Sequence, residues 1–155
     1  MRAVIQRVDR ARVVVDGKEI SSIGKGILAL VAIAREDVRA DLEWVARKIA
    51  ELRIFDDAGG KLNLSLKDVD GELLIVSQFT LYGDCRKGRR PSYSDAAPPD
   101  QAQALYDDFV RIARQWVVGA QSGQFQAVMQ VELLNSGPVT LIIESPARHP
   151  GVGSV

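Results

Sequence analysis

The stretch Val128–Ile143, VMQVELLNSGPVTLII, places a Gly-Pro pair at residues 137 and 138 between two apolar runs with the character of strands. Glycine has no Cβ and proline has no backbone N–H, so the pair imposes an unusual backbone and leaves its carbonyl groups free to point elsewhere. A chain uses such a pair either for a turn or for a site built from main-chain atoms. The stretch therefore decides how the last strands are arranged and poses the first functional question.

Strand patterns precede this stretch along most of the chain. Apolar runs rich in β-branched residues predict strands over residues 2–8, 11–16, 19–23, 26–33, 72–77 and 126–133. Asp16-Gly17 is a hairpin signal between the second and third of these strands. An irregular or short helical piece is expected over residues 61–66, and a long loop from Tyr82 to about Pro99.

Two segments have helical spacing. Asp37 is expected to cap a helix that ends near Leu52, and Asp100 is expected to cap a second helix. The apolar face of the second helix is predicted at Ala104, Leu105, Phe109, Ile112 and Trp116. We therefore predict an α+β fold, in which two main helices pack on one face of a curved, mainly antiparallel, barrel-like sheet.

Length and composition indicate a single domain. The chain has 155 residues, of which 46% are hydrophobic, enough for a substantial core. No apolar run reaches the roughly 20 residues of a membrane span, and residues 1–7 lack the apolar region of a signal peptide. The lone Cys85 fits a reducing cytoplasm. We expect a domain over residues 1–144 and a flexible tail over 145–155, which is rich in Pro, Gly and Ser.

The net charge is zero, but positive charge gathers in two places that could attract phosphate. The first cluster holds Arg2, Arg7, Arg10 and Arg12, and the second holds Arg86, Lys87, Arg89 and Arg90. The alternative is that both are merely solvated surface stretches.

The usual catalytic groups are missing. The only histidine, His149, falls in the expected tail, which disfavours a histidine-based triad or general base. The motifs of zinc sites, serine hydrolases and nucleotide-binding loops are absent, so neither a metal nor a cofactor is expected. Cys85 could act as a nucleophile, and inactivation by a thiol reagent would then follow, but no histidine is available to assist it.

Hydroxyl and main-chain groups remain. Ser77, Gln78, Phe79 and Thr80 come directly after the apolar strand Leu73-Leu74-Ile75-Val76, where a site is common. The alternative is that Ser77 and Thr80 only end the strand while Phe79 fills the core.

Two segments together, Ser77-Gln78-Phe79-Thr80-Leu81 and Asn135-Ser136-Gly137-Pro138-Val139-Thr140, resemble the signature motifs of the D-aminoacyl-tRNA deacylases. Further similar segments are Ile5-Gln6-Arg7-Val8, Arg53-Ile54-Phe55, Gly60-Lys61-Leu62-Asn63 and Gly88-Arg89-Arg90-Pro91-Ser92-Tyr93. The resemblance covers essentially residues 1–144, and both motifs occur in order.

The resemblance implies a homodimer that hydrolyses the ester between a D-amino acid and the 3′ end of a tRNA. It also implies action on glycine mischarged onto alanine tRNA. The Gly137–Pro138 bond would be cis, and the pair would enter the active site of the other subunit to exclude L-amino acids. Substrate binding and chiral selection would fall to Gly137, Pro138, Asn135, Val139 and Arg7.

The same resemblance assigns the pocket around the ester to Ser77, Gln78, Phe79 and Thr80. Backbone amides near Phe79 and Thr80 could form an oxyanion hole. Thr80 has no base to activate it, so attack by water assisted by the 2′-hydroxyl of the terminal adenosine is favoured. Arg86, Lys87, Arg89 and Arg90 become candidates for acceptor-stem phosphates. The competing hypothesis is a non-catalytic RNA-binding module.

Overall fold

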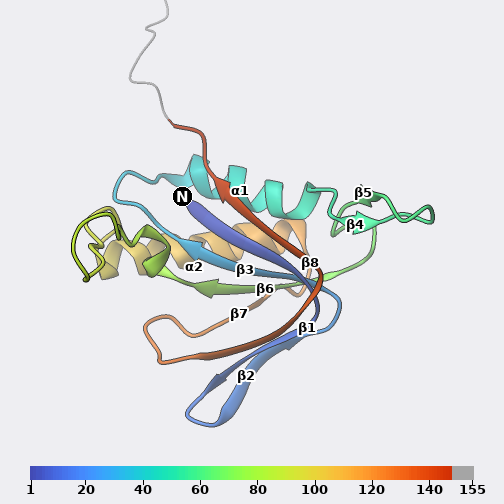
Figure 1. Cartoon of the computed structure of the whole chain (residues 1–155), viewed down its shortest axis with the longest axis horizontal. Coiled ribbons are helices and arrows are strands. Elements are labelled where there is room, and N and C mark those ends of the chain that lie inside the picture. Colours follow the sequence, from blue (N-terminus) through green and yellow to red (C-terminus); the bar gives the residue numbers. More distant parts are fainter. Residues whose placement is uncertain (148–155) are drawn as a thin grey trace, which may run out of the picture.

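The computed structural model describes residues 1–147, which form one curved sheet, a small two-stranded sheet and two long helices (Figure 1). In chain order the elements are β1 (Arg2–Val15), β2 (Lys18–Ile23), β3 (Gly26–Ala32), α1 (Arg39–Glu51), β4 (Phe55–Asp56), β5 (Leu62–Leu64), β6 (Glu72–Ser77), the 3-10 helix η1 (Phe79–Tyr82), α2 (Pro99–Trp116), β7 (Gln121–Ser122) and β8 (Gln130–Glu144).

The main sheet is mixed rather than mainly antiparallel, which corrects that part of the prediction. Its order is β2-β1-β3-β6-β7, and β8 pairs with the other edge of β1. β1 runs antiparallel to β2, β3 and β8, whereas β3–β6 and β6–β7 are parallel. The parallel pairs arise because α1 and α2 lie in the connections, and a crossover through a helix brings the chain back in the same direction.

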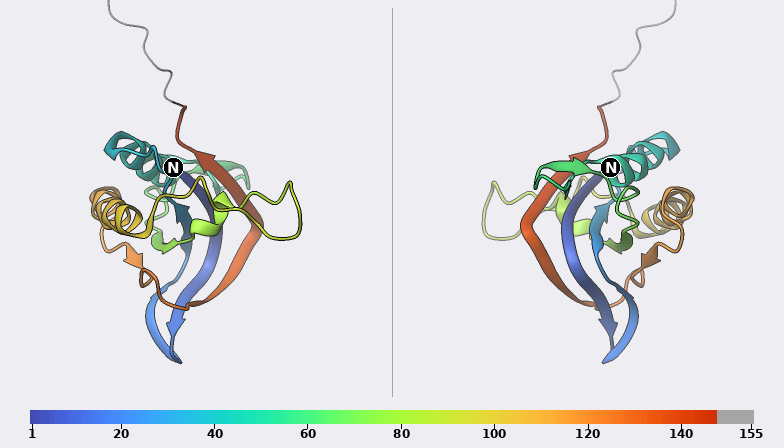
Figure 2. Two further views of the ribbon diagram at one scale, coloured as in Figure 1. Left: turned by 90° about the vertical axis from the view of Figure 1, so that its left-hand side faces the viewer. Right: turned by 90° about the vertical axis from the view of Figure 1, so that its right-hand side faces the viewer.

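The sheet bends into a nearly closed, barrel-like layer with both helices on one side of it (Figure 2). These features confirm the α+β class, the curvature and the helix placement that the sequence predicts. β1 is one continuous strand rather than two: β3 pairs with its first half and β2 with its second half.

The core lies mainly between the helices and the sheet. Leu42 and Ile49 of α1 and Phe109 of α2 are fully buried there against strand residues such as Ile5 and Ile75. Burying a side chain of this size contributes about 1.5–3 kcal/mol, so this interface anchors the fold. A second cluster covers the opposite face of the sheet with Val8, Ala11, Val13, Ile23, Leu28, Leu74 and Val76.

Both helix starts differ from the sequence prediction. α1 has Val38 at its N-cap position, and the Asp41 carboxylate accepts a hydrogen bond from the Val38 N–H at 2.9 Å. Asp37 instead accepts hydrogen bonds from the Ala34 N–H and from the Met1 amino group. α2 begins at Pro99, with Pro98 at the N-cap position. Proline suits the first turn because its missing N–H needs no partner there, and Asp100 lies inside that turn. Ala104, expected on the apolar face, is exposed.

β8 settles the first question about the Gly-Pro pair, because the pair lies inside this strand and not in a turn. Val8 of β1 faces Asn135, and Gln6 faces Thr140. The single residue Arg7 therefore lies opposite the four residues 136–139, which form a pronounced bulge. The bulge turns the Gly137–Pro138 segment out of the regular ladder.

Residues 61–66, expected to be irregular or helical, contain β5, which pairs with β4. At the C-terminal end, the Ser145 N–H donates to the Met1 carbonyl at 2.9 Å. Most of the predicted tail, including His149, lies outside the described residues. No helix within residues 1–147 is long and apolar enough to cross a membrane.

Candidate active site

A cavity of about 960 Å³ opens where β3 and β6 end. Both strands are parallel here, and the carboxyl ends of parallel strands commonly form binding sites. The walls come from the ends of β3 and β6, the loop before α2, the start of α2, and the segment that leads into and begins β8. They comprise Ala32, Ile33, Arg35, Val76, Ser77, Gln78, Phe79, Tyr93, Ala96, Ala97, Pro98, Pro99, Ala102, Phe125, Gln126, Ala127, Met129 and Val131.

Three of the four predicted pocket residues line this cavity. Ser77, Gln78 and Phe79 are wall residues, and the Gln78 N–H donates to the Val31 carbonyl at 2.7 Å, which ties the segment to β3. The Thr80 hydroxyl accepts a hydrogen bond from the Gln78 side-chain amide. Phe79 does not fill the core: its side chain is 54% exposed and meets the Tyr93 ring edge-on at 5.1 Å.

Two backbone amides at the start of η1 are free to act as donors. The first amides of a helix have no partner within it. Within residues 1–147 no acceptor is found for the Phe79 and Thr80 N–H groups, whereas the next amide, Leu81, donates to the Gln78 carbonyl at 3.1 Å. Adjacent amides of this kind are suited to stabilise a developing oxyanion beside the cavity.

Few wall residues can ionise. In the described part of the chain only Arg35 and Tyr93 carry ionisable side chains in the wall. Behind it, the Tyr106 hydroxyl donates to the Ile75 carbonyl at 3.0 Å, and burial raises the pKa of Tyr106 well above its ordinary value. The wall thus offers no carboxylate, imidazole or thiol as a general base, and hydroxyl, amide and main-chain groups dominate its chemistry.

Arg7 and Asn135 brace the Gly137–Pro138 segment. The peptide bond is cis, as the resemblance implies, and both residues are exposed. The Arg7 side chain is largely buried, and its Nε donates to the Ser136 carbonyl at 2.8 Å while Nη1 donates to the Ile54 carbonyl at 2.8 Å. Asn135 clamps the other side: its Oδ1 accepts from the Val139 N–H at 2.8 Å.

The two predicted site segments do not meet within one chain. Neither Gly137 nor Pro138 lines the cavity that Ser77, Gln78 and Phe79 form. The braced segment instead projects from β8 on its own.

The two basic clusters behave differently from each other. In the first, Arg2 pairs with Glu144 at 2.6 Å, and Arg12 pairs with Glu132 at 2.9 Å. Arg7 is also engaged in its contacts with Ser136 and Ile54, so within residues 1–147 Arg10 is the one member of the first cluster that is exposed without an ion pair.

In the second cluster Arg86 pairs with Asp84 at 2.7 Å, and these hydrogen bonds lower the pKa of the Asp84 carboxyl to about 2. Lys87, Arg89 and Arg90 are exposed, and no ion pair of theirs is found among the described residues. The neighbouring Cys85 is exposed as well. No three His, Cys, Asp or Glu side chains within residues 1–147 lie where they could hold a metal ion.

Sequence reasoning did not find most of the cavity wall. Ala96 and Ala97 and the segment Phe125–Ala127 come from loops, whose apolar residues show no periodicity. The long loop before α2 was a general signal of function. Arg35 was missed because it stands alone between a strand and a helix.

Fold and cavity together define a single-domain α+β protein whose site offers main-chain amides and hydroxyls. Residues 4–144 match the family model described as D-Tyr-tRNA(Tyr) deacylase. The D-aminoacyl-tRNA deacylase of Thermosipho africanus is 57% identical to this chain over 145 residues, which cover 94% of this chain and 97% of the relative. The D-aminoacyl-tRNA deacylase of Desulfatibacillum aliphaticivorans is 56% identical over 145 residues, which cover 94% of this chain and 99% of the relative. The chain belongs to the D-aminoacyl-tRNA deacylase family and is a hydrolase.

Solved structures agree in fold. A structure described as c-Myc DNA Unwinding Element Binding Protein is 45% identical, with a TM-score of 0.90 over 95% of this chain and 100% of that chain. A probable eukaryotic D-amino acid tRNA deacylase, 21% identical, has a TM-score of 0.79 over 92% of this chain and 98% of that chain. The second likeness concerns the fold alone.

Proposed function

We propose that this deacylase works as a homodimer, in which the Gly137–Pro138 segment of one subunit forms a wall of the other subunit's pocket. The observation that carries the proposal is the separation of the two site segments. The segment is exposed and firmly braced by Arg7 and Asn135, yet it takes no part in the cavity of its own chain. A rigid, projecting segment of this kind suits a role in a second molecule.

The free edge of β8 supports the dimer. Within residues 1–147 β8 pairs only with β1, so in this part of the chain its other edge is an unpaired row of backbone groups. Apolar side chains of β8 are exposed: Ile142 is 71% exposed, and Leu133, Leu134 and Leu141 are also exposed. Exposed apolar residues on a long edge strand favour association with another chain.

In this proposal the Gly137 and Pro138 carbonyls receive the substrate α-amino group, and the wall leaves no room for an L side chain. Losing one weak apolar contact would discriminate by only about 1–3 kcal/mol, whereas a steric wall can do more. Glycine has no side chain to exclude, so glycine mischarged onto alanine tRNA would also be hydrolysed.

The chemistry follows from the available groups. Water, oriented by the 2′-hydroxyl of the terminal adenosine, attacks the ester carbonyl carbon, and the Phe79 and Thr80 amides stabilise the oxyanion. The bond between the carbonyl carbon and the 3′ oxygen then breaks. The attacking water gives up one proton, the 3′ oxygen takes up one proton as it leaves, and the products are the free D-amino acid and tRNA with its 3′-hydroxyl restored.

Lys87, Arg89 and Arg90 are proposed to attract the acceptor stem, with Arg86 contributing less because Asp84 already holds it. Such contacts would make binding weaken as salt rises. Since aminoacyl-tRNA is the substrate, the proposed place of action is the cytoplasm.

Deacylation of D-Tyr-tRNA, L-Tyr-tRNA and Gly-tRNA(Ala) by the purified protein tests this function. We expect turnover of the D and glycyl substrates and resistance of the L substrate. Equal rates of hydrolysis of D-Tyr-tRNA and L-Tyr-tRNA would contradict the proposal that the Gly137–Pro138 segment excludes L-amino acids. Binding of all three without turnover would favour an RNA-binding module instead.

A further inference from the structure

We propose that Arg35 binds the phosphate on the 5′ side of the substrate's terminal adenosine. The inference rests on the aminoacyl-tRNA substrate of the preceding section. The proposed contact joins one residue of the cavity rim to one group of that substrate.

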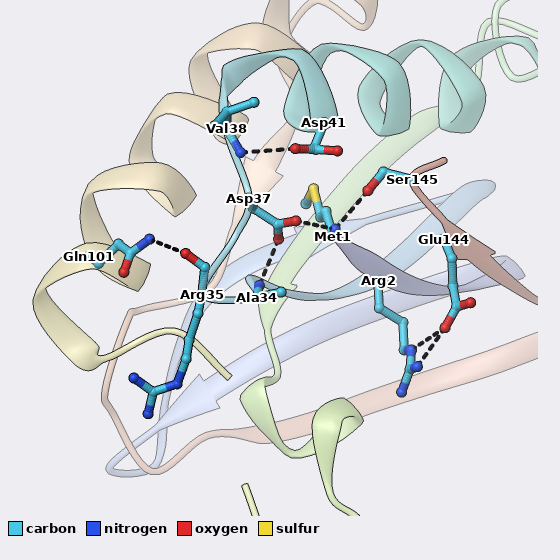
Figure 3. A network of polar contacts seen from close by, with 10 residues as sticks. All are labelled: Met1, Arg2, Ala34, Arg35, Asp37, Val38, Asp41, Gln101, Glu144 and Ser145. Carbon is cyan, nitrogen blue, oxygen red and sulfur yellow. Dashed lines mark hydrogen bonds and ion pairs between the residues drawn. The ribbon is translucent and has the colours of Figure 1, made fainter. Parts of the chain in front are cut away.

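Arg35 has a distinctive position. It lies three residues after the end of β3, and it is the one residue with a permanent charge in the cavity wall described above. Its side chain points away from the buried polar network around Met1 and Asp37 (Figure 3). A substrate that enters the cavity therefore passes a guanidinium at the rim.

The backbone that presents Arg35 is held from several directions. The Arg35 carbonyl accepts from the Gln101 side chain of α2 at 2.9 Å, and the Arg35 N–H donates to the Asp95 carbonyl at 3.3 Å. The preceding amide, Ala34, donates to Asp37 at 2.6 Å, and Asp37 also accepts from the Met1 amino group (Figure 3). A residue fixed in this way loses little conformational freedom when a ligand binds.

The guanidinium is oriented but not neutralised. Its Nε donates to the Ser94 carbonyl at 2.6 Å, which anchors one edge of the group. No partner of its two terminal nitrogens and no carboxylate ion pair is found within residues 1–147. By contrast Arg39, four residues further on, forms an ion pair with Glu43 at 2.8 Å.

The substrate carries one kind of group that suits this arrangement. The amino acid is esterified, so it has no carboxylate, and its α-amino group is a cation that an arginine would repel. The phosphodiesters are the anions, and the one nearest the ester lies on the 5′ side of the terminal ribose. Two terminal nitrogens of a guanidinium match two phosphate oxygens in a bidentate contact.

Two small esters isolate this contact: 2′(3′)-O-D-tyrosyl-adenosine, which has no phosphate, and the same ester of adenosine 5′-monophosphate. For Arg35→Ala we expect a KM about tenfold higher for the phosphorylated ester, the size of a charge-assisted hydrogen bond. The KM for the nucleoside ester and kcat for both esters stay unchanged. Arg35→Lys keeps the positive charge but cannot form the bidentate contact, so its KM for the phosphorylated ester should lie between those of Arg35→Ala and the wild type.

With D-Tyr-tRNA, Arg35→Ala should also reduce the slope of log KM against log salt by about 0.7, the value for one phosphate contact on a single strand. Arg39→Ala is the matched control and leaves all these quantities unchanged.

Two results would overturn the assignment. One is an equal loss on both small esters, which would mean that Arg35 only shapes the cavity. The other is an unchanged KM for the phosphorylated ester. Turnover of the nucleoside ester by the wild type measures deacylation alone. If the proposed function is wrong, the wild type does not hydrolyse this ester, whereas a wrong assignment of Arg35 shows only in the KM values of Arg35→Ala relative to the wild type.

Discussion

At the scale of single residues, the catalytic proposal depends on the main chain of η1 more than on its side chains. Phe79 is the first residue of η1, and its amide has no acceptor within the described residues. Proline is well tolerated at a first helical position and lacks the N–H, so it can remove this donor without breaking the helix.

We therefore predict different results for Phe79→Ala and Phe79→Pro. Both lose the aromatic contact with Tyr93, but only the proline variant loses the amide. Relative to Phe79→Ala, Phe79→Pro should lower kcat by about 100-fold to 1,000-fold, as for other oxyanion-hole donors. Single-turnover deacylation of D-Tyr-tRNA measures the difference. Equal rates would rule out this amide as an oxyanion donor.

Thr80→Ala is expected to retain measurable turnover. The substitution keeps the Thr80 amide and removes only a hydroxyl that already accepts a hydrogen bond from Gln78. Complete loss of activity in a folded variant, or an acyl group trapped on Thr80 of the wild type and seen by mass spectrometry, would make Thr80 a nucleophile.

Arg7→Ala should affect both stability and selectivity. Arg7 is largely buried, and truncation leaves the Ser136 and Ile54 carbonyls without their donor. We expect the free energy of unfolding to fall by about 2–4 kcal/mol and the preference for D over L substrates to drop. Urea unfolding and paired D and L deacylation assays measure the two effects.

Arg12→Ala is the control, because Arg12 lies on the same strand but forms exposed ion pairs with Glu132 and Glu19. Its truncation should leave selectivity unchanged. An Arg7→Ala protein that loses stability but keeps full selectivity would show that Arg7 does not brace the wall.

At the scale of elements, η1 is joined to β1 through Arg2. The Arg2 side chain donates to the Leu81 carbonyl at 2.7 Å and lies over the Tyr82 ring at 4.8 Å. Tyr82 closes η1 and is partly buried, and burial, with the nearby Asp37 charge, raises its pKa to about 12. The hydroxyl thus binds its proton more tightly in the folded chain than in the unfolded chain.

The raised pKa of Tyr82 predicts that the folded protein loses stability at alkaline pH. The contribution of the protonated Tyr82 hydroxyl to the free energy of unfolding is complete below the ordinary tyrosine pKa of about 10 and is lost as pH rises through about 12. Urea midpoints measured from pH 9 to pH 12 should therefore fall less steeply in Tyr82→Phe than in the wild type. Parallel curves for the two proteins would contradict the prediction.

Elements with a local pattern could be predicted from the sequence. Val38 to Leu52 and Asp100 to Trp116 carry helical periodicity, and the strands around Val4, Leu28 and Ile75 are apolar runs, so these elements formed close to where they were expected. Periodicity belongs to a single segment and needs no knowledge of its neighbours.

Features that depend on distant partners could not be predicted in this way. The bulge at residues 136–139 is defined by its register against Arg7 on the distant strand β1, and β4 and β5 are too short to show a pattern. The two parallel strand pairs follow from how the helical connections return to the sheet. In the site, the motif around Ser77 was found, but Ala96, Phe125 and Arg35 meet it only through tertiary structure.

At the scale of the whole molecule, our proposal places the two halves of the site in different subunits. The cavity lies where β3 and β6 end, and the braced segment projects from β8 beside an edge that pairs with no other described strand. In a twofold dimer each subunit would lend its segment to the partner and receive the partner's in return. This arrangement can be distinguished from a site completed within one chain by mixing two inactive variants.

Gly137→Ala provides the variant with a damaged wall. Gly137 has a φ of +132°, which L side chains rarely adopt, and an added Cβ would lie 2.9 Å from Arg7 Nη2 and 2.8 Å from Val139 Cγ2. Phe79→Pro provides the variant with a damaged cavity. Each homodimer should be inactive or strongly impaired on D-Tyr-tRNA.

Co-refolding the two variants in equal amounts should restore activity if the segment works across the dimer. Half of the dimers would then be mixed, and one of the two sites in each would combine an intact cavity with an intact wall. About a quarter of the wild-type activity is expected. If each chain completes its own site, every site keeps one defect and mixing restores nothing, so deacylation by the mixture, compared with the two variants assayed separately, decides between the arrangements.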